Sequence, residues 1–302
     1  MHLIRLAKHA LRLSYAAPVA GALLRWYRVS RDRKSLTNSP VEKASWEKRQ
    51  RIALECQELQ CIPRHPAAGT TRNGILTMHS GVKVLSFSYY GEGARLLIAA
   101  ARGVHEPQEE YLFQEVLKFV PPGSTMLELG AYWGFYSIWY KSVVKHARCL
   151  LVEPIEANLD YGRCNFRLNK MRGEFIQAYV GTAPPDGDPR LTVISVDRIV
   201  KEKRIDRLAI LHADIQEAED QMLEGARESF AKRIIDYCFI STHTDALHEK
   251  CLQYLLHQQY TILAEYDLKE TYSEDGLIVA KRPGLDNPRP ISVSKRSPPT
   301  SF

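Results

Sequence analysis

Two apolar runs with a glycine-bounded turn between them constrain the fold of this chain most. The first run begins at Met126 and ends at Gly130, and Gly134 follows after three further residues. The second run ends at Glu153 and Pro154. This order predicts a strand, a tight turn, a helix and a second, parallel strand. The turn and the acid would then meet in one crevice at the carboxyl ends of the two strands.

The glycine spacing discriminates between classes of cofactor. A dinucleotide turn has the pattern G-x-G-x-x-G, which lets a diphosphate lie against the helix N-terminus. Here three non-glycine residues separate Gly130 from Gly134, which disfavours a NAD-dependent redox enzyme. An acid, Glu128, precedes the turn. S-adenosylmethionine suits such a site better, because it has no phosphate and its ammonium group favours a nearby carboxylate.

We therefore predict an S-adenosylmethionine site in this crevice. The methionine end would lie at the turn, and the acid after the second strand would accept the ribose hydroxyls. The predicted cofactor-binding residues are Glu128, Gly130, Ala131, Tyr132, Gly134, Glu153 and Pro154. The alternative is an α/β domain whose glycines serve only to pack helix against strand.

Strands and helices alternate through the rest of the chain. Strands are predicted near 125–129, 148–152, 174–179, 206–213 and 234–240, and helices near 135–145, 156–168, 218–229 and 246–258. Segments 261–265 and 277–281 would complete the sheet as an antiparallel hairpin. The pattern predicts an α/β, Rossmann-like fold, with a mostly parallel sheet and helices on both faces.

Four parts follow from the pattern. Residues 1–34 form a basic amphipathic segment, and residues 35–105 a cap with a charged helix over 40–60 and a hairpin that turns at Gly81. Residues 106–283 form the α/β domain. The remaining residues, 284–302, are rich in Pro, Ser and Arg without an apolar period, which predicts a disordered tail.

Residues 1–34 hold eight lysines and arginines against Asp32 alone, although the whole chain carries a net charge of only +6. The apolar run at 13–24 contains Pro18 and is shorter than the ~20 residues that span a bilayer. No small-x-small cleavage site follows it, so we predict neither a transmembrane helix nor a secretory signal. Three interpretations stay open: a helix on an anionic membrane surface, an organelle-targeting leader, and an arm packed on the domain.

Charge and cysteine content limit which substrates, metal sites and cellular compartments we expect. The chain beyond the basic segment is close to neutral, which argues against a nucleic-acid substrate. The six cysteines show no C-x-x-C pair and no His/Cys spacing, so no zinc site is predicted. Cysteines inside apolar strands favour a reducing compartment, and we expect a cytoplasmic protein with peripheral membrane contact as an option.

Five motifs in order resemble the FkbM-type S-adenosylmethionine-dependent methyltransferases over about residues 106–283. The family's D-V-G-A-N-x-G corresponds to 128–134, F-E-P to 152–154, L-D-x-[LI] to 196–199, K-I-D-x-E-G-A-E to 212–219 and D-G-L-I-V-A to 275–280. The spaced asparagines Asn165 and Asn169 follow the second motif. The resemblance implies a class I methyltransferase fold and O-methylation, frequently of a sugar hydroxyl on a glycan or natural product.

The chain departs from this pattern at three positions. Tyr132 replaces the usual asparagine, and Gln216 and Glu217 stand at the acid and glycine positions of a later motif. The pair Tyr132 and Trp133 either plugs the cofactor loop or forms an aromatic wall. A catalytically silent protein that serves as a binding or scaffold module is therefore the alternative to an enzyme.

The carboxyl ends of the later strands supply the predicted catalytic residues. Asp214 would organise the reacting end, and His243 would act as base with Asp245 or His212 as its orienting partner. His243 could instead simply cap the following helix. Asp214 and His243 alone are weak support for a metal, so none is predicted. The expected acceptor is a small molecule, a sugar or, given the basic segment, a glycolipid.

Overall fold

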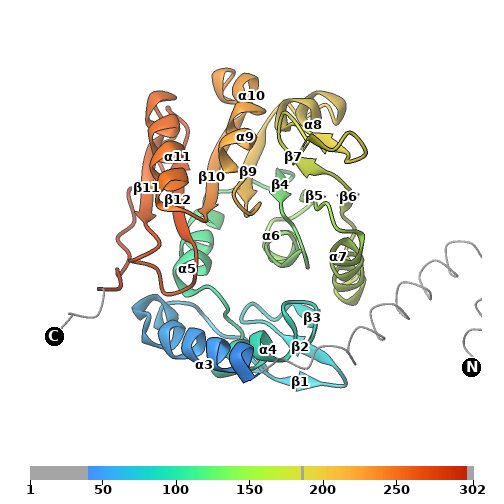
Figure 1. Ribbon diagram of the computed structural model, residues 1–302, viewed down its shortest axis with the longest axis vertical. Coiled ribbons are helices and arrows are strands. Elements are labelled where there is room, and N and C mark those ends of the chain that lie inside the picture. Colours follow the sequence, from blue (N-terminus) through green and yellow to red (C-terminus); the bar gives the residue numbers. More distant parts are fainter. Residues whose placement is uncertain (1–39, 185–186, 298–302) are drawn as a thin grey trace, which may run out of the picture.

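The computed structural model describes residues 40–184 and 187–297 (Figure 1). Their centre is a seven-stranded sheet. In spatial order its strands are β11 (Thr261–Tyr266), β12 (Gly276–Lys281), β10 (Ile235–Thr242), β9 (Leu208–Ala213), β4 (Thr125–Leu129), β5 (Arg148–Val152) and β6 (Glu174–Ile176). Only β12 runs antiparallel to its neighbours. The predicted Rossmann-like fold, with its C-terminal antiparallel hairpin, is confirmed.

Helices cover both faces of this sheet and enclose two apolar layers (Figure 1). One layer contains side chains of α5 (Pro107–Leu117), α6 (Phe135–Val143) and α7 (Glu156–Leu168). The other contains side chains of α8 (Val196–Glu202), α9 (Glu219–Glu224), α10 (Arg227–Ala231) and α11 (Asp245–His257). Along β4, Met126 packs in the first layer and Leu127 in the second, as strand alternation requires.

The cap precedes the sheet and lies along one side of it (Figure 1). It comprises α3 (Pro40–Glu55), a 3-10 turn η1 (Gln57–Gln60), a small sheet of β1 (Thr71–Arg72), β2 (Ile75–Thr77) and β3 (Lys83–Leu85), and α4 (Gly91–Ala100). The predicted hairpin is present, with antiparallel pairing of β2 and β3 around Gly81. The sequence did not predict β1 or α4.

Two asparagines, one in α7 and one directly after it, attach the cap to the sheet domain. Asn165 is fully buried; its Oδ1 accepts the Leu85 N–H at 2.8 Å, and its Nδ2 donates to Ser88 Oγ and the Trp133 carbonyl. Asn169 is half-buried and bonds both backbone groups of Lys83. The spaced asparagines noted in the sequence thus join the cap to α7.

The prediction of a disordered tail is wrong for residues 284–297. Ser294 donates from its backbone N–H and its Oγ to the carboxylate of Glu58 in η1. Ile291 N–H donates to the Leu263 carbonyl of β11. The tail has no regular secondary structure but links the cap to the terminal hairpin.

Some element boundaries differ from the predicted ones. The single helix expected at 218–229 is divided into α9 and α10 around Gly225, and the strand expected at 174–179 is divided into β6 and β7 (Tyr179–Val180). A short strand β8 (Val193–Ile194) pairs with β7. The basic segment 1–34 lies outside the described residues. Among those that are described, no helix is long and apolar enough to cross a membrane.

We expect Asn165→Ala to lower the free energy of unfolding by about 2 kcal/mol or more, because it leaves buried backbone and hydroxyl groups without partners. Asn169→Ala should cost less, since water can reach the groups it exposes. Urea denaturation of both variants measures the difference. Equal losses at the two positions would contradict the buried linkage.

Candidate functional site

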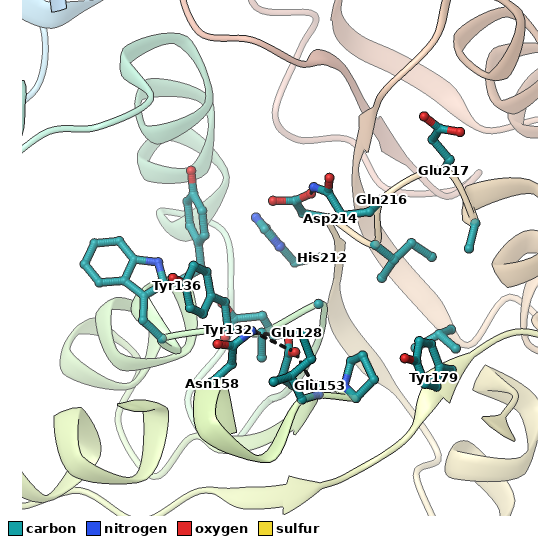
Figure 2. Close-up of a pocket in the computed structure, with 18 of the residues that line it drawn as sticks. Glu128, Tyr132, Tyr136, Glu153, Asn158, Tyr179, His212, Asp214, Gln216 and Glu217 are labelled. Carbon is teal, nitrogen blue, oxygen red and sulfur yellow. Dashed lines mark hydrogen bonds between the residues drawn. The ribbon is translucent and has the colours of Figure 1, made fainter. Parts of the chain in front are cut away.

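A cavity of about 710 Å³ lies at the carboxyl ends of β4, β5 and β9 (Figure 2). This volume is within the range of small-molecule sites. Of the predicted cofactor residues, Glu128, Gly130, Ala131, Tyr132, Glu153 and Pro154 line it and Gly134 does not. Of the predicted catalytic residues, His212 and Asp214 line it and His243 does not. Tyr89 and Tyr90 of the cap complete one wall.

Glu153 borders the cavity after β5, with only 5% of its surface exposed. One carboxylate oxygen accepts the Tyr132 N–H at 3.2 Å, and the other accepts the Ile155 N–H and the Asn158 amide. Burial raises the pKa of this carboxyl, although these hydrogen bonds oppose the rise. Because a carboxylate accepts about four hydrogen bonds, roughly one position remains for a ligand hydroxyl.

The glycines of the turn were expected to make room for a cofactor, but contacts within the protein already explain the glycine at 130. Gly130 has φ +70°, and a Cβ there would lie 1.6 Å from the Asp214 carbonyl oxygen. At Gly134, with φ +72°, a Cβ would lie 3.0 Å from Leu151. Packing against backbone therefore requires the glycine at position 130, whether or not a ligand binds. At Gly134 the positive φ favours glycine, and the Leu151 side chain has to move only slightly for a Cβ.

The residues at the three positions that depart from the FkbM pattern have positive φ angles. Tyr132 has φ +41°, Gln216 +54° and Glu217 +70°. The left-handed region costs a residue with a Cβ roughly 1–2 kcal/mol. Glu217 thus adopts the conformation that a glycine would adopt more easily.

Trp133 and Tyr132 form a wall and do not fill the cavity. The Trp133 ring stacks on Tyr89 of the cap at 4.7 Å between centroids, and the Tyr132 hydroxyl accepts the Tyr90 N–H. Both residues line a cavity that remains open. Of the two interpretations of this pair, the structure supports the aromatic wall.

Carboxylates dominate the charge around the cavity. Five acidic residues line it: Glu106, Glu128, Glu153, Asp214 and Glu217. Glu128 accepts the Ser137 N–H at 3.0 Å, and burial raises its pKa. Such a lining repels phosphates and attracts cationic ligands.

A layer of buried histidines, paired with acids at the start of α5, continues this lining into the interior; His105, Glu106 and His212 line the cavity themselves. His212 is paired in register with Glu128 on the neighbouring strand, and its Nε2 lies 2.8 Å from Glu109 Oε1. Burial raises the pKa of Glu109 to about 6, against the opposing contact with His212. This layer was not predicted from the sequence; the three glutamates that closely follow His105 were the signal for it.

His105 is the second centre of that layer. Its two ring nitrogens lie 3.1 Å from Glu106 and 2.6 Å from Glu110. Burial lowers the pKa of His105, but the charges of these two glutamates outweigh it and raise the pKa to about 10. The same contacts overcome burial to hold the pKa of Glu110 well below its usual range.

His243 has other partners than those predicted. Its Nδ1 lies 2.7 Å from the buried Glu219, and its Nε2 lies 3.2 Å from Asp214. Asp245 pairs instead with Lys269, and His212 with Glu109, so neither orients His243. The predicted orienting partners are therefore wrong; sequence reasoning missed Glu219 because it comes from a helix.

The charge state of His243 also argues against its predicted role as base. Burial lowers its pKa, but the hydrogen bonds to Asp214 and Glu219 and the charge of Asp275 raise it to about 10. The imidazole in this arrangement carries a proton at neutral pH. A base needs a free nitrogen at the working pH.

No protein-family model matches the chain, and no curated protein matches its sequence. Solved structures do match. The chain is similar to precorrin-6y C5,15-methyltransferase from Geobacter metallireducens, with 12% identity, 59% of this chain and 90% of that one covered, and a TM-score of 0.42. It is similar to TrmK from M. capricolum in complex with S-adenosyl-homocysteine, with 14% identity, 58% and 71% covered, and a TM-score of 0.40. It is also similar to fibrillarin from Aeropyrum pernix with bound S-adenosyl-L-methionine, with 15% identity, 56% of this chain and 73% of that one covered, and a TM-score of 0.37. None of these likenesses decides the function.

We expect Gly130→Ala to unfold the protein or lower its unfolding free energy far more than Gly123→Ala. Both glycines have positive φ, but a Cβ at Gly123 meets nothing within 4 Å, so that change should cost only about 1–2 kcal/mol. Urea denaturation gives the unfolding free energy of both variants, and the soluble yield shows whether Gly130→Ala folds at all. Similar losses would show that the Asp214 carbonyl does not constrain the turn.

The buried His105 cluster predicts a pH-dependent stability. Because its folded-state pKa lies above the ordinary value of 6.5, its stabilisation is complete below about pH 6.5 and is lost as the pH rises towards 10. His105→Gln should therefore reduce the fall in unfolding free energy between pH 7 and 9 by about 1.4 kcal/mol per pH unit.

Urea denaturation at pH 7, 8 and 9 gives this slope. His257→Gln, on the exposed end of α11, is the control and should keep the wild-type slope. An unchanged slope in His105→Gln would show that His105 takes up no extra proton on folding.

Proposed function

We propose that this protein is an S-adenosylmethionine-dependent methyltransferase that methylates a hydroxyl of a sugar, glycan or glycolipid. The observation that carries the proposal is the acid-lined cavity at the carboxyl ends of β4, β5 and β9. Ligands bind outside this edge in open α/β sheets. A ligand with ammonium and sulfonium charges suits the lining, whereas a dinucleotide would place a diphosphate among carboxylates.

The residues present fit this cofactor. Glu128, which ends the strand before the glycine turn, lines the cavity where the methionine end would lie. Glu153 would accept about one ribose hydroxyl, fewer than the two expected from the sequence, because three internal donors already occupy it. Bound S-adenosylmethionine would supply an electrophilic methyl group.

The chain's own contribution to transfer would be mainly alignment. Asp214 lines the cavity with its side chain partly exposed, so it can accept a hydrogen bond from an acceptor hydroxyl. Figure 2 shows Asp214 and Gln216 close together near His212. The Glu109 contact fixes the ring of His212 against this rim.

The aromatic wall supports a sugar acceptor. Tyr90 is 49% exposed, and it lines the cavity together with Tyr89 and Tyr132. Rings with a polar group can contact both the apolar and the hydroxyl faces of a sugar. Membership of the FkbM family and membrane contact through residues 1–34 remain predictions.

Two observations favour the alternative of a catalytically silent binding module. Internal packing accounts for Gly130, and internal donors occupy most of Glu153. A protein of this kind would keep the fold without binding the cofactor. Cofactor affinity distinguishes it from the enzyme.

We expect calorimetry to show saturable binding of S-adenosylmethionine to the full chain and none of NAD. Glu153→Gln should weaken this binding at least ten-fold, since it removes the charge and one acceptor at the ribose position. Glu249→Gln, on the exposed surface of α11, is the matched control and should bind like wild type.

Absence of binding by the wild-type chain would move the conclusion to the silent module. Equal binding by Glu153→Gln and wild type would place the ribose elsewhere. If binding follows the expected pattern, transfer of labelled methyl groups to sugars and glycolipids tests the acceptor.

A further inference from the structure

Three side chains from neighbouring strands meet beside the cavity. Asp214 follows β9, His243 follows β10, and Asp275 precedes β12. Because β12 runs antiparallel to β10, its beginning lies at the edge where β9 and β10 end. The topology therefore brings together residues far apart in the sequence.

Their potential ligand atoms are close enough to share one ion. One oxygen of each aspartate and one ring nitrogen of the histidine all lie within 4.8 Å of one another. His243 Nε2 is 3.2 Å from Asp214 Oδ1 and 3.6 Å from Asp275 Oδ1. Among the residues that the structure describes, no other group of three His, Cys, Asp or Glu side chains could hold a metal ion in this way.

A fourth residue, Glu219, contacts the histidine of this cluster from the buried side. Glu219 is fully buried on α9, and its Oε1 lies 2.7 Å from His243 Nδ1. Its Oε2 has no hydrogen-bond partner among the described residues. A buried carboxylate on one ring nitrogen is the arrangement that fixes a histidine whose other nitrogen binds a metal.

Gln216 brings a further polar group to His243 Nε2. The Gln216 side-chain nitrogen lies 2.8 Å from this ring nitrogen and 3.2 Å from Asp214 Oδ1. If the amide donates to both, the ring nitrogen is unprotonated and its lone pair faces two carboxylates. If the amide is reversed, its oxygen faces the Asp214 carboxylate instead. Without an ion, a proton on the His243 ring compensates these carboxylates. A divalent ion would replace that proton and hold the ring nitrogen and both carboxylates as ligands.

We propose that Asp214, His243 and Asp275 bind one divalent cation of the Mn²⁺ type, with Glu219 as the positioning residue for His243. Two carboxylates and one imidazole suit an ion that accepts oxygen and nitrogen ligands together. An octahedral ion would keep about three positions for water or substrate oxygens.

The cation would also extend the site already described. Asp214 belongs both to the cluster and to the cavity lining, so the open positions can face the cavity. An acceptor with neighbouring hydroxyls could bind there through its oxygens. This last role rests on the proposed methyl transfer, whereas the cation site itself does not.

The test is a Mn²⁺ titration of the full chain, without cofactor, followed by loss of the electron paramagnetic resonance signal of free Mn²⁺. We expect one saturable site. His243→Gln and Asp275→Asn should weaken binding at least ten-fold, and Glu219→Gln about 10–100-fold. Circular dichroism melting of each variant shows that it is folded.

Asp245→Asn is the matched control, because Asp245 lies two residues from His243 but pairs with Lys269. It should bind Mn²⁺ like wild type. No saturable binding by wild type, or unchanged binding by both folded ligand variants, would overturn the site. Mn²⁺ binding by a chain that fails to bind S-adenosylmethionine would support the cation site and contradict the proposed function alone.

Discussion

The pairing of β4 with β9 is the contact on which the site depends. Its parallel register places Glu128 beside His212, and the Asp214 N–H donates to the Leu129 carbonyl at the end of the pair. The turn at Gly130 then passes over the Asp214 carbonyl with no room for a Cβ. The ends of β4 and β9 that border the cavity are thus joined through their backbones, and the remaining groups are arranged around them.

The negative charge of the carboxylates at the cavity is the second constraint on the structure. The cavity concentrates carboxylates at a partly buried surface, which is costly unless cations or donors compensate. On the α5 side the compensation is internal, through His105 and His212. On the β10 side a single histidine faces three acids, Glu219, Asp214 and Asp275. The molecule therefore has a negative edge where its strands end, and that polarity decides which ligands can approach.

The sequence predicted the sheet because its strands are apolar runs of ordinary length separated by clear turns, and it predicted the acids that follow those strands. It did not predict α4, since a helix that begins at Gly91 and contains Gly93 has low intrinsic propensity. Gly93 is there because Trp46 occupies the space of a Cβ, a contact that only the folded chain creates. Glu109 and Glu219 were missed for the same reason: they come from helices and reach the site through tertiary packing.

The contact between Ser294 and Glu58 has a consequence for biosynthesis. Glu58 belongs to the cap, which is made before any strand of the large sheet, whereas Ser294 is made after all of them. The ribosome therefore releases the cap long before two of the hydrogen bonds that hold its buried carboxylate become available. The strands of the large sheet are all synthesised before Ser294, so the cap can acquire this attachment only after the whole sheet has been made.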